Sequence, residues 1–198
     1  VLPVMTDTAP SAPPCEALAH LKTALRKNRR HAHHRYFQLA SVTAEGYPRN
    51  RTVVFRGFAT DDQTLLVITD SRSDKIAEFA QNGAAEIAWY FTETREQFRI
   101  RVVTSCLSSV TDSTEGAALR EQVWQQLSDG ARAQFFWRSP GLALGAGTTL
   151  ATTEAVPETF ALLKLSPVAI DHLVLSKVQT RRHSQLIDEH WHEQWINP

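Results

Sequence analysis

The chain has 198 residues, which is enough for one domain with a substantial core, and its 42% hydrophobic and 21% charged residues are typical of a globular protein. Its 21 basic and 21 acidic residues leave a formal net charge of zero, which argues against a dedicated nucleic-acid-binding protein, because such proteins usually carry a basic excess. Two widely spaced cysteines, Cys15 and Cys106, exclude a disulfide framework, and no apolar run approaches the roughly 18 residues of a membrane span. We therefore expect a cytoplasmic protein without a membrane or nucleic-acid partner.

Residues 1–14 are rich in Pro, Ala, Ser and Thr and are predicted to form a flexible tail ahead of one domain over residues 15–198. They lack the charged and apolar regions of a signal peptide. Met5 is the only methionine, so we expect it to be the native start of the chain.

Leucines at helical spacing predict a helix over residues 15–28. The basic stretch that follows holds His31, His33 and His34. These histidines are compatible with a metal site or with a solvated connector. The connector is favoured, because no cysteine or paired carboxylate lies nearby in the sequence to complete a set of ligands. No metal site is therefore predicted.

From residue 36 onwards the hydrophobic period changes towards two, which indicates strands. Strands are predicted at residues 36–43, 51–55, 64–69, 85–91, 97–105, 160–165 and 168–175, the last two separated by a break at Pro167. Helices are predicted at 73–81 and 113–128, the second with core positions Ala117, Leu119, Val123 and Leu127. Residues 141–153, rich in Gly, Ala and Thr, are predicted to be a mobile loop. Because the strands follow one another too closely for βαβ crossovers, we expect an α+β fold built around a small antiparallel barrel.

The strand that begins at Arg51 carries a second arginine, Arg56, five residues later. Strand alternation places Thr52, Val54 and Arg56 on one face and Arg51, Val53 and Phe55 on the other. Taken alone, this pattern is more typical of a solvated strand than of a binding site.

The segment Thr69-Asp-Ser-Arg-Ser-Asp-Lys75 leads directly into a predicted helix whose N-cap is Ser73. The free N–H groups of the first turn, the helix dipole and the side chains of Arg72 and Lys75 would converge on one spot, an arrangement by which proteins bind phosphate without a glycine-rich loop. The alternative is an ordinary capped helix with surface charges.

Gln97 lies on a later strand and offers both a donor and an acceptor, as the imide edge of a flavin requires. In this order the runs RTVVFRGF, TDSRSDK and REQFRIR resemble the pyridoxamine 5′-phosphate oxidase superfamily of FMN-binding split barrels, and most of all its oxidase-related branch from cyanobacteria and proteobacteria. The resemblance spans about residues 15–198. It implies an antiparallel split β-barrel with flanking helices, FMN as the cofactor, and a homodimer with FMN in the subunit interface.

The resemblance also assigns roles to individual residues. Arg51 corresponds to the arginine that holds the FMN phosphate, and Arg56 stands where the family has a lysine that reaches both flavin and substrate. Asp74 stands where the oxidases have an arginine, and Arg72, two places earlier, is expected to replace it. Near the C-terminus Arg182 is expected to contact the flavin, in competition with Arg181 and His183. The implied FMN-binding residues are Arg51, Thr52, Val53, Val54, Arg56, Thr69, Arg72, Ser73, Lys75, Gln97 and Arg182.

The substrate-binding elements of the family match less well. No Tyr–Arg–Ser trio can be placed in residues 123–138, and the Arg-Leu-His of the oxidases is replaced by the run Gln-Thr-Arg-Arg-His over residues 179–183. The candidate substrate-binding residues are Arg56, Arg138 and Arg181, with Arg132 as a further possibility. Alternatively, residues 135–137, Phe-Phe-Trp, wall off an apolar substrate pocket.

The resemblance implies an FMN-dependent oxidoreductase in which a hydride passes from a small-molecule substrate to the flavin and oxygen then reoxidises the flavin. No catalytic side chain is predicted, in agreement with the absence of a convincing Ser–His–Asp or Cys–His arrangement. Two alternatives remain. One is a flavin reductase or another FMN enzyme acting on an unrelated small molecule. The other is a non-catalytic flavin-binding or haem-binding module, which only the three histidines support.

Overall fold

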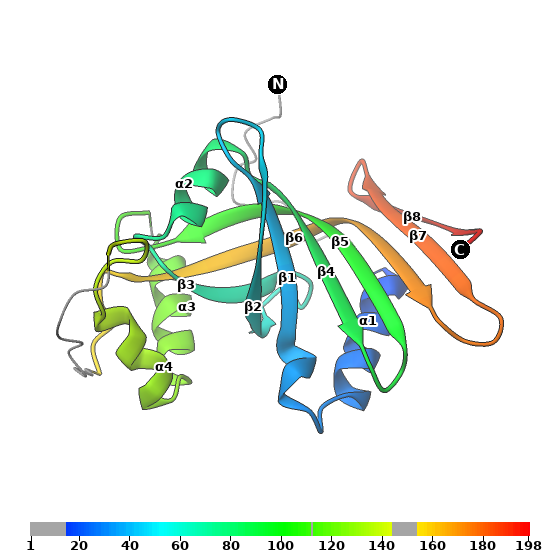
Figure 1. Cartoon of the computed structure of the whole chain (residues 1–198), viewed down its shortest axis with the longest axis horizontal. Coiled ribbons are helices and arrows are strands. Elements are labelled where there is room, and N and C mark those ends of the chain that lie inside the picture. Colours follow the sequence, from blue (N-terminus) through cyan, green and yellow to red (C-terminus); the bar gives the residue numbers. More distant parts are fainter. Residues whose placement is uncertain (1–14, 112, 144–153) are drawn as a thin grey trace.

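The computed structural model describes residues 15–111, 113–143 and 154–198. The predicted flexible tail, the start at Met5 and most of the predicted mobile loop lie outside these residues. Figure 1 shows a strongly curved sheet with helices at its ends and sides.

Eight antiparallel strands form one sheet with the neighbour order β3-β2-β1-β4-β5-β6-β7-β8. A further pairing of β3 with β6 closes the first six strands of this order into a barrel, and the hairpin β7–β8 extends from β6 beyond it. The predicted α+β fold with an antiparallel barrel and flanking helices is confirmed. The strands are β1 (Tyr36–Val42), β2 (Pro48–Phe58), β3 (Leu65–Asp70), β4 (Ala84–Phe91), β5 (Glu96–Leu107), β6 (Phe160–Val174), β7 (Thr180–Ile187) and β8 (His190–Ile196).

The strand β6 runs unbroken through Pro167, so the predicted break at this proline is wrong. One edge of β6 pairs with β5, and the other edge pairs first with β3 through residues 160–165 and then with β7 through residues 169–174. Pro167 lies between these two pairings and beside a shift of register against β5. A residue without an N–H group is tolerated in a sheet at such an interruption of the ladder.

The helices pack against the barrel and the sheet. They are α1 (Glu16–Lys27), α2 (Asp74–Gln81), α3 (Thr114–Gln125) and α4 (Asp129–Ala133), with short 3₁₀ helices η1 (Ala32–Arg35) and η2 (Gln134–Phe136). Leu18 and Leu21 of α1 are fully buried in the main core, as the leucine spacing predicts. Cys15 caps α1, because its sulfur accepts a hydrogen bond from the Leu18 N–H group. Neither Cys15 nor Cys106 forms a disulfide in the described part of the chain.

The predicted helix over residues 113–128 is divided, because Ser128 starts a new helix by accepting a hydrogen bond from the Ala131 N–H group. The prediction of Ala117 as a core residue is wrong, since Ala117 is exposed. The inner face of α3 instead carries Trp124, which packs in a second core cluster with Phe135 and Phe160. The indole N–H group of Trp124 donates to the carbonyl of Glu154, so the buried ring has no unsatisfied polar atom.

Within the described part of the chain, no helix combines the length and the apolar character that crossing a membrane requires.

Candidate functional site

A cavity of about 710 Å³ opens beside β2, β3 and the start of α2. Its other wall is formed by residues of the segment 134–141 that follows α4. This volume lies in the range of small-molecule and cofactor sites. Among the predicted cofactor-binding residues, the cavity is lined by Arg51, Thr52, Val53, Val54, Arg56, Thr69, Ser73 and Lys75.

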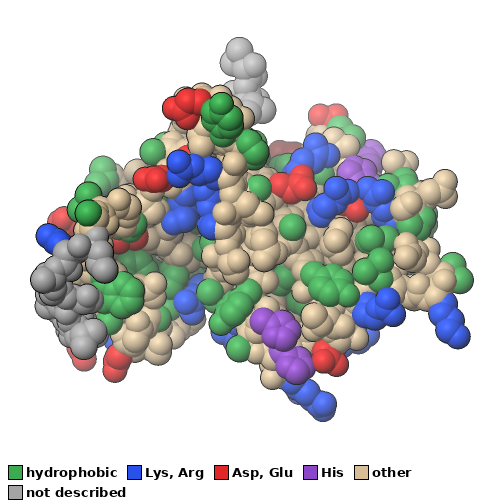
Figure 2. Space-filling view, in the orientation of Figure 1, with side chains coloured by type: hydrophobic (Ala, Val, Ile, Leu, Met, Phe, Trp, Pro, Cys, Tyr) green, Lys and Arg blue, Asp and Glu red, His purple; other side chains and the backbone are tan. Residues whose placement is uncertain are grey.

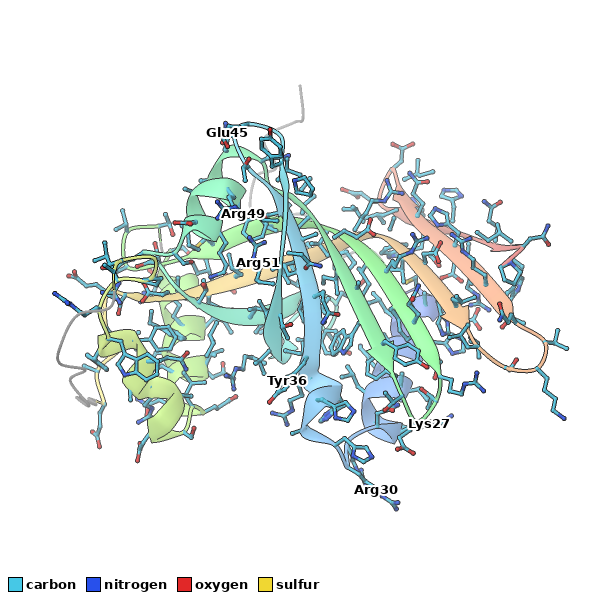
Figure 3. All side chains as sticks on the ribbon, viewed as in Figure 1. Lys27, Arg30, Tyr36, Glu45, Arg49 and Arg51 are labelled. Carbon is cyan, nitrogen blue, oxygen red and sulfur yellow. The ribbon has the colours of Figure 1, made fainter. Side chains whose placement is uncertain are left out.

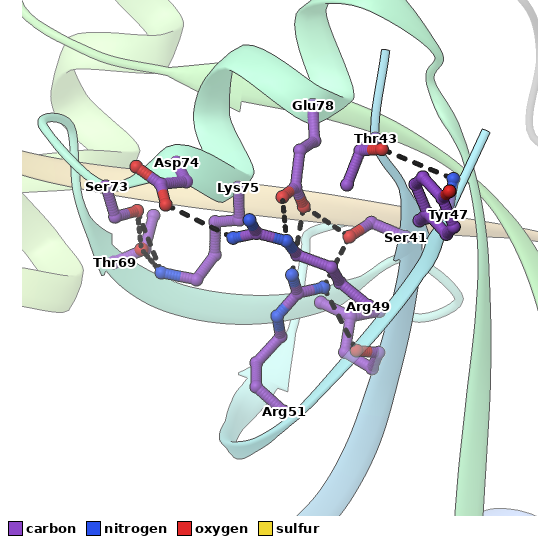
Figure 4. Close-up of polar contacts among 11 residues, drawn as sticks. Ser41, Thr43, Tyr47, Arg49, Arg51, Thr69, Ser73, Asp74, Lys75 and Glu78 are labelled. Carbon is purple, nitrogen blue, oxygen red and sulfur yellow. Dashed lines mark hydrogen bonds and ion pairs between the residues drawn. The ribbon is translucent and has the colours of Figure 1, made fainter. Parts of the chain in front are cut away.

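Arg51 is held at the cavity wall by three groups of the protein. Its Nη1 donates to the Leu39 carbonyl at 3.2 Å and to the Ser41 hydroxyl at 2.6 Å, and its Nη2 contacts the Glu78 carboxylate on α2 at 2.9 Å (Figure 4). Glu78 is buried and also accepts a hydrogen bond from Ser41. The guanidinium of Arg51 is therefore fixed in orientation before any ligand binds.

Lys75 points back from the first turn of α2 towards the end of β3. Its ammonium group donates to the hydroxyls of Thr69 at 2.9 Å and Ser73 at 2.8 Å. Ser73 occupies the predicted N-cap position, but its hydroxyl makes no capping hydrogen bond, because it is engaged by Lys75. Burial, followed by the charge of Arg51, lowers the pKa of Lys75, although the carboxylates of Asp70, Glu78 and Asp74 act to raise it.

Arg56 lines the same cavity, although strand alternation places it on the face opposite Arg51. A shift of register between Phe55 and Gly57 leaves Arg56 without a partner residue on β3, and such a bulge changes the direction of a side chain. Its Nε is buried and has no hydrogen-bond acceptor among the described residues. Burial, followed by the charge of Arg35, lowers the pKa of Arg56. A buried donor without a partner is a rare feature that a bound ligand would satisfy.

The structure does not place Arg72 in the cavity wall, contrary to the expectation from the sequence. Its guanidinium forms a two-pronged ion pair with Asp70 at 2.9 and 2.6 Å and donates to the Trp137 carbonyl at 3.0 Å. Arg72 therefore links the segment just before α2 to Trp137 in the other wall of the cavity. The pairing with Asp70 engages the Nε and Nη2 donors of Arg72.

Sequence reasoning missed two residues of this site, Arg49 and Glu78. Arg49 lines the cavity and pairs with Asp74 at 3.2 Å and Glu78 at 3.6 Å. Figure 3 shows Arg49 and Arg51 next to each other on β2, and Figure 2 shows basic side chains gathered beside the β1–β2 hairpin. Only the spacing of these residues could have indicated that they belong to the site. Arg49 is two residues before Arg51, so the two share one face of the strand, and Glu78 is three residues after Lys75, so the two share one side of the helix.

The predicted substrate-side residues divide between two places. Arg138 lines the cavity together with Trp137, which is 46% exposed. Phe135 also lines the cavity, but it is buried in the second core cluster, and Phe136 packs against that cluster. The wall formed by residues of the segment 134–141 thus offers one cation, Arg138, and one accessible aromatic ring, Trp137. Arg132 instead donates to the carbonyls of Trp124 and Gln125.

Gln97 and Arg181 lie on a different surface, formed by β5, β6 and β7. Both residues pair with Leu173 of β6, so their side chains share one face of the sheet. The next row on that face is Arg99, Asp171 and His183. Arg181 donates three hydrogen bonds to the Asp171 carboxylate, the shortest at 2.7 Å. Arg181 and Arg99 hold the pKa of Asp171 low although its burial acts to raise it.

Arg182 points to the opposite face of β7, where it pairs with His172 of β6. It is buried, contacts the carboxylates of Glu16 and Glu193, and lies 4.4 Å from the centre of the Trp195 ring. Of the three competing residues 181–183, the structure thus separates Arg182 from the face that carries Gln97, while Arg181 and His183 share it. Sequence reasoning could not make this distinction without the register of β7.

The three histidines of the basic connector contact groups of the protein itself. His31 pairs with Glu93 at 2.9 Å, His33 contacts Thr92, and His34 contacts the His31 carbonyl. No group of three metal-ligating side chains occurs in residues 15–111, 113–143 and 154–198. His31 and His33 are exposed, and residues 32–35 form the short helix η1.

Comparison with known proteins identifies relatives over most of the chain. A family model described as the pyridoxamine 5′-phosphate oxidase, FMN-binding domain matches residues 17–108. Pyridoxine/pyridoxamine 5′-phosphate oxidase 2 of Arabidopsis thaliana is 30% identical over 184 residues, covering 88% of this chain and 93% of that protein.

Two solved structures resemble the chain along nearly its whole length. A pyridoxamine 5′-phosphate oxidase-related, FMN-binding protein from Nostoc punctiforme has a TM-score of 0.88 and 38% identity, covering 94% of this chain and 100% of that chain. PhzG from Burkholderia lata has a TM-score of 0.79 and 20% identity, with 94% of each chain covered, and shows that the fold is shared.

Proposed function

Because the chain belongs to the pyridoxamine 5′-phosphate oxidase family of FMN-binding proteins, we propose that it binds FMN in the cavity and acts as an FMN-dependent oxidoreductase. The observation that carries this proposal is the convergence of Arg51 and Lys75 with the hydroxyls of Thr69 and Ser73 on one wall of a cavity of cofactor size. A phosphate group, with several charged acceptor oxygens, matches these donors and the first turn of α2.

The residues present fit the cofactor chemically. Arg51 and Lys75 would hold the phosphate, and the β2 residues Thr52, Val53 and Val54 would line the rest of the cofactor. The buried Nε of Arg56 would find an acceptor on the bound ligand. When bound, FMN supplies a ring that accepts a hydride, which no protein side chain can do.

The remaining walls favour a small anionic substrate. Arg56 and Arg138 line the cavity as cations, and Trp137 offers an aromatic surface for a ring to contact. We propose that these groups orient the substrate and exclude water from it, so that no protein side chain needs to act as a nucleophile. Pyridoxamine and pyridoxine 5′-phosphates, which combine a ring with a phosphate, are the first substrates to test.

A second copy of the chain is proposed to complete the site. Gln97, Arg181 and His183 share a sheet face that does not contribute to the cavity of their own chain. In a homodimer this face would approach the partner's cavity and supply Gln97 to the flavin and Arg181 to the substrate. The alternation Arg181-Arg182-His183 supports this role, because it presents an arginine and a histidine side by side, as the Arg-Leu-His of the oxidases would.

The direct test is purification followed by an absorption spectrum, FMN titration and a substrate screen. We expect flavin absorption that is retained on gel filtration, and peroxide release with at least one phosphorylated vitamin B6 compound. A protein that binds no FMN would refute the proposal. Oxidation of a nicotinamide nucleotide without peroxide release from any amine or alcohol substrate would favour a flavin reductase instead.

A further inference from the structure

We propose that Arg49 is the third cation of the phosphate-binding wall and determines specificity for a flavin that carries a terminal phosphate. This inference rests on the proposed function, since it concerns the same cavity. It replaces the expectation that Arg72 supplies the third cation, because the guanidinium of Arg72 is held by Asp70 and lies outside the cavity lining.

Arg49 adds to the donors that Lys75 and Arg51 keep for a ligand. Two of the three protons of Lys75 are directed to Thr69 and Ser73, and the terminal nitrogens of Arg51 donate to Leu39, Ser41 and Glu78, so these two cations offer only part of their donors. Arg49 uses its Nη1 for Asp74 and its Nε for Glu78. Its Nη2 has no acceptor among the described residues, and a guanidinium offers five donors in a fixed fork.

The position of Arg49 also suits an arriving anion. Its side chain is 52% exposed, whereas the side chain of Arg51 is 21% exposed, so Arg49 is the more accessible arginine of the wall. Two contacts to α2, one to Asp74 in the first turn and one to buried Glu78, limit the conformations that a long exposed side chain would otherwise sample (Figure 4). A preorganised side chain loses less entropy when a ligand binds.

Asp74 gives Arg49 a second effect on the charge of the site. A carboxylate in the first turn is favourable for the helix dipole but repels an anion that approaches the same turn. Arg49 compensates this negative charge through its contact at 3.2 Å. Removing Arg49 therefore removes a cation and leaves the carboxylate of Asp74 uncompensated at the mouth of the phosphate wall.

The experiment compares Arg49→Ala with the matched control Arg72→Ala by titration with FMN and with riboflavin, which has the same ring but no phosphate. We expect Arg49→Ala to raise the Kd for FMN by about 10- to 100-fold and to leave the Kd for riboflavin within about twofold, because one charge-assisted contact is lost. Unchanged riboflavin binding also shows that the variant is folded. Arg72→Ala, which removes the ion pair with Asp70 in the cavity lining, is expected to change the affinity for FMN much less than Arg49→Ala does.

The inference is overturned if Arg49→Ala binds FMN like the parent, or if Arg72→Ala loses the preference for FMN while Arg49→Ala keeps it. An equal loss of FMN and riboflavin affinity in Arg49→Ala also overturns it, since the residue would then act on the ring or on the fold. These results are distinct from failure of the proposed function, in which the parent chain itself binds no flavin.

Discussion

Glu78 and Arg51 form a 2.9 Å ion pair between the buried face of α2 and the wall of the cavity. The carboxylate of Glu78 is only 8% exposed and also faces Ser41 and Arg49. The helix is thereby held to β2 by an arginine that also lines the cavity. If the proposed anion binds there, we expect its binding to be coupled to the stability of the chain.

Glu78→Gln is expected to lower the free energy of unfolding by about 3 kcal/mol, because it leaves a partly buried arginine without its counter-charge. Urea denaturation of the protein without added flavin measures this loss. Glu121→Gln, a change of an exposed glutamate on α3, serves as the control and should have little effect. A loss below about 0.5 kcal/mol for Glu78→Gln would contradict the role assigned to the pair.

The double variant Arg51→Ala/Lys75→Ala is expected to abolish measurable FMN binding at micromolar protein. Each change removes a charge-assisted phosphate contact worth about 1.5–3 kcal/mol. Quenching of flavin fluorescence on titration measures the affinity. If this variant bound FMN as tightly as the parent, the assignment of the phosphate to this wall would be wrong.

FMN binding should weaken as the pH rises towards the alkaline range, and it should weaken at a lower pH than an ordinary lysine would impose. Burial and Arg51 lower the pKa of Lys75 from its usual value of about 10.4, so its charge is lost earlier as protons are removed. Above about pH 7 the phosphate is almost entirely a dianion, so its own charge stays constant over this range. Titrations at several pH values measure the effect.

The matched control for this pH dependence is Lys75→Arg, which keeps its charge throughout the range. Its affinity for FMN should be flatter with pH than that of the parent chain. Identical pH profiles for the two proteins would show that another group is responsible.

Mixed dimers provide a test of the shared site. Lys75→Ala is expected to damage the cavity, and Gln97→Ala/Arg181→Ala is expected to damage the face supplied by the partner. When the two differently tagged chains are co-expressed, each mixed dimer should contain one intact site and bind about one FMN. The proposed shared site would be contradicted if mixed dimers bound FMN as poorly as dimers made of either variant alone. It would also be contradicted if the chain were monomeric at all concentrations.

Arg182→Ala should reduce stability without changing the FMN affinity of the folded protein. The side chain of Arg182 is 8% exposed, contacts Glu16 of α1 and Glu193 of β8, and stacks near Trp195. Loss of these contacts should cost about 3 kcal/mol of unfolding free energy. Thermal unfolding and an FMN titration well below the melting temperature separate the two effects. A large loss of FMN affinity in the folded variant would show that Arg182 takes part in FMN binding.

Most strands could be predicted from their period-two pattern, because that pattern reports directly which side chains face the core. The prediction of β6 was wrong at Pro167, because proline lacks an N–H group and usually interrupts a strand. The sequence does not show that Pro167 lies between the pairing of β6 with β3 and its pairing with β7, where no N–H group is required. Ala117 was misplaced because several faces of α3 carry apolar residues, and only packing against Phe160 selects the face of Trp124.

The site was predictable only in part. Arg51 and Lys75 lie in recognisable local motifs, and the fold brings them to one cavity. Asp70 and Arg72 are neighbours in the sequence, but the sequence does not show that Arg72 pairs with Asp70 and faces away from the cavity. The approach of Arg49 to α2 depends on a long-range contact. The direction of Arg182 likewise required the register of β7 against β6.

The shared edge of β6 has a consequence for how the chain folds during its synthesis. Leu65 of β3 pairs with Leu165 of β6, so the barrel cannot close until a segment one hundred positions later has left the ribosome. Until then β3 and β5 each present an unpaired edge, which is prone to pair with other chains. Slow translation between β5 and β6 should therefore favour aggregation of nascent chains. A separate peptide of residues 160–174, added during translation, should suppress this aggregation by pairing with the free edges of β3 and β5.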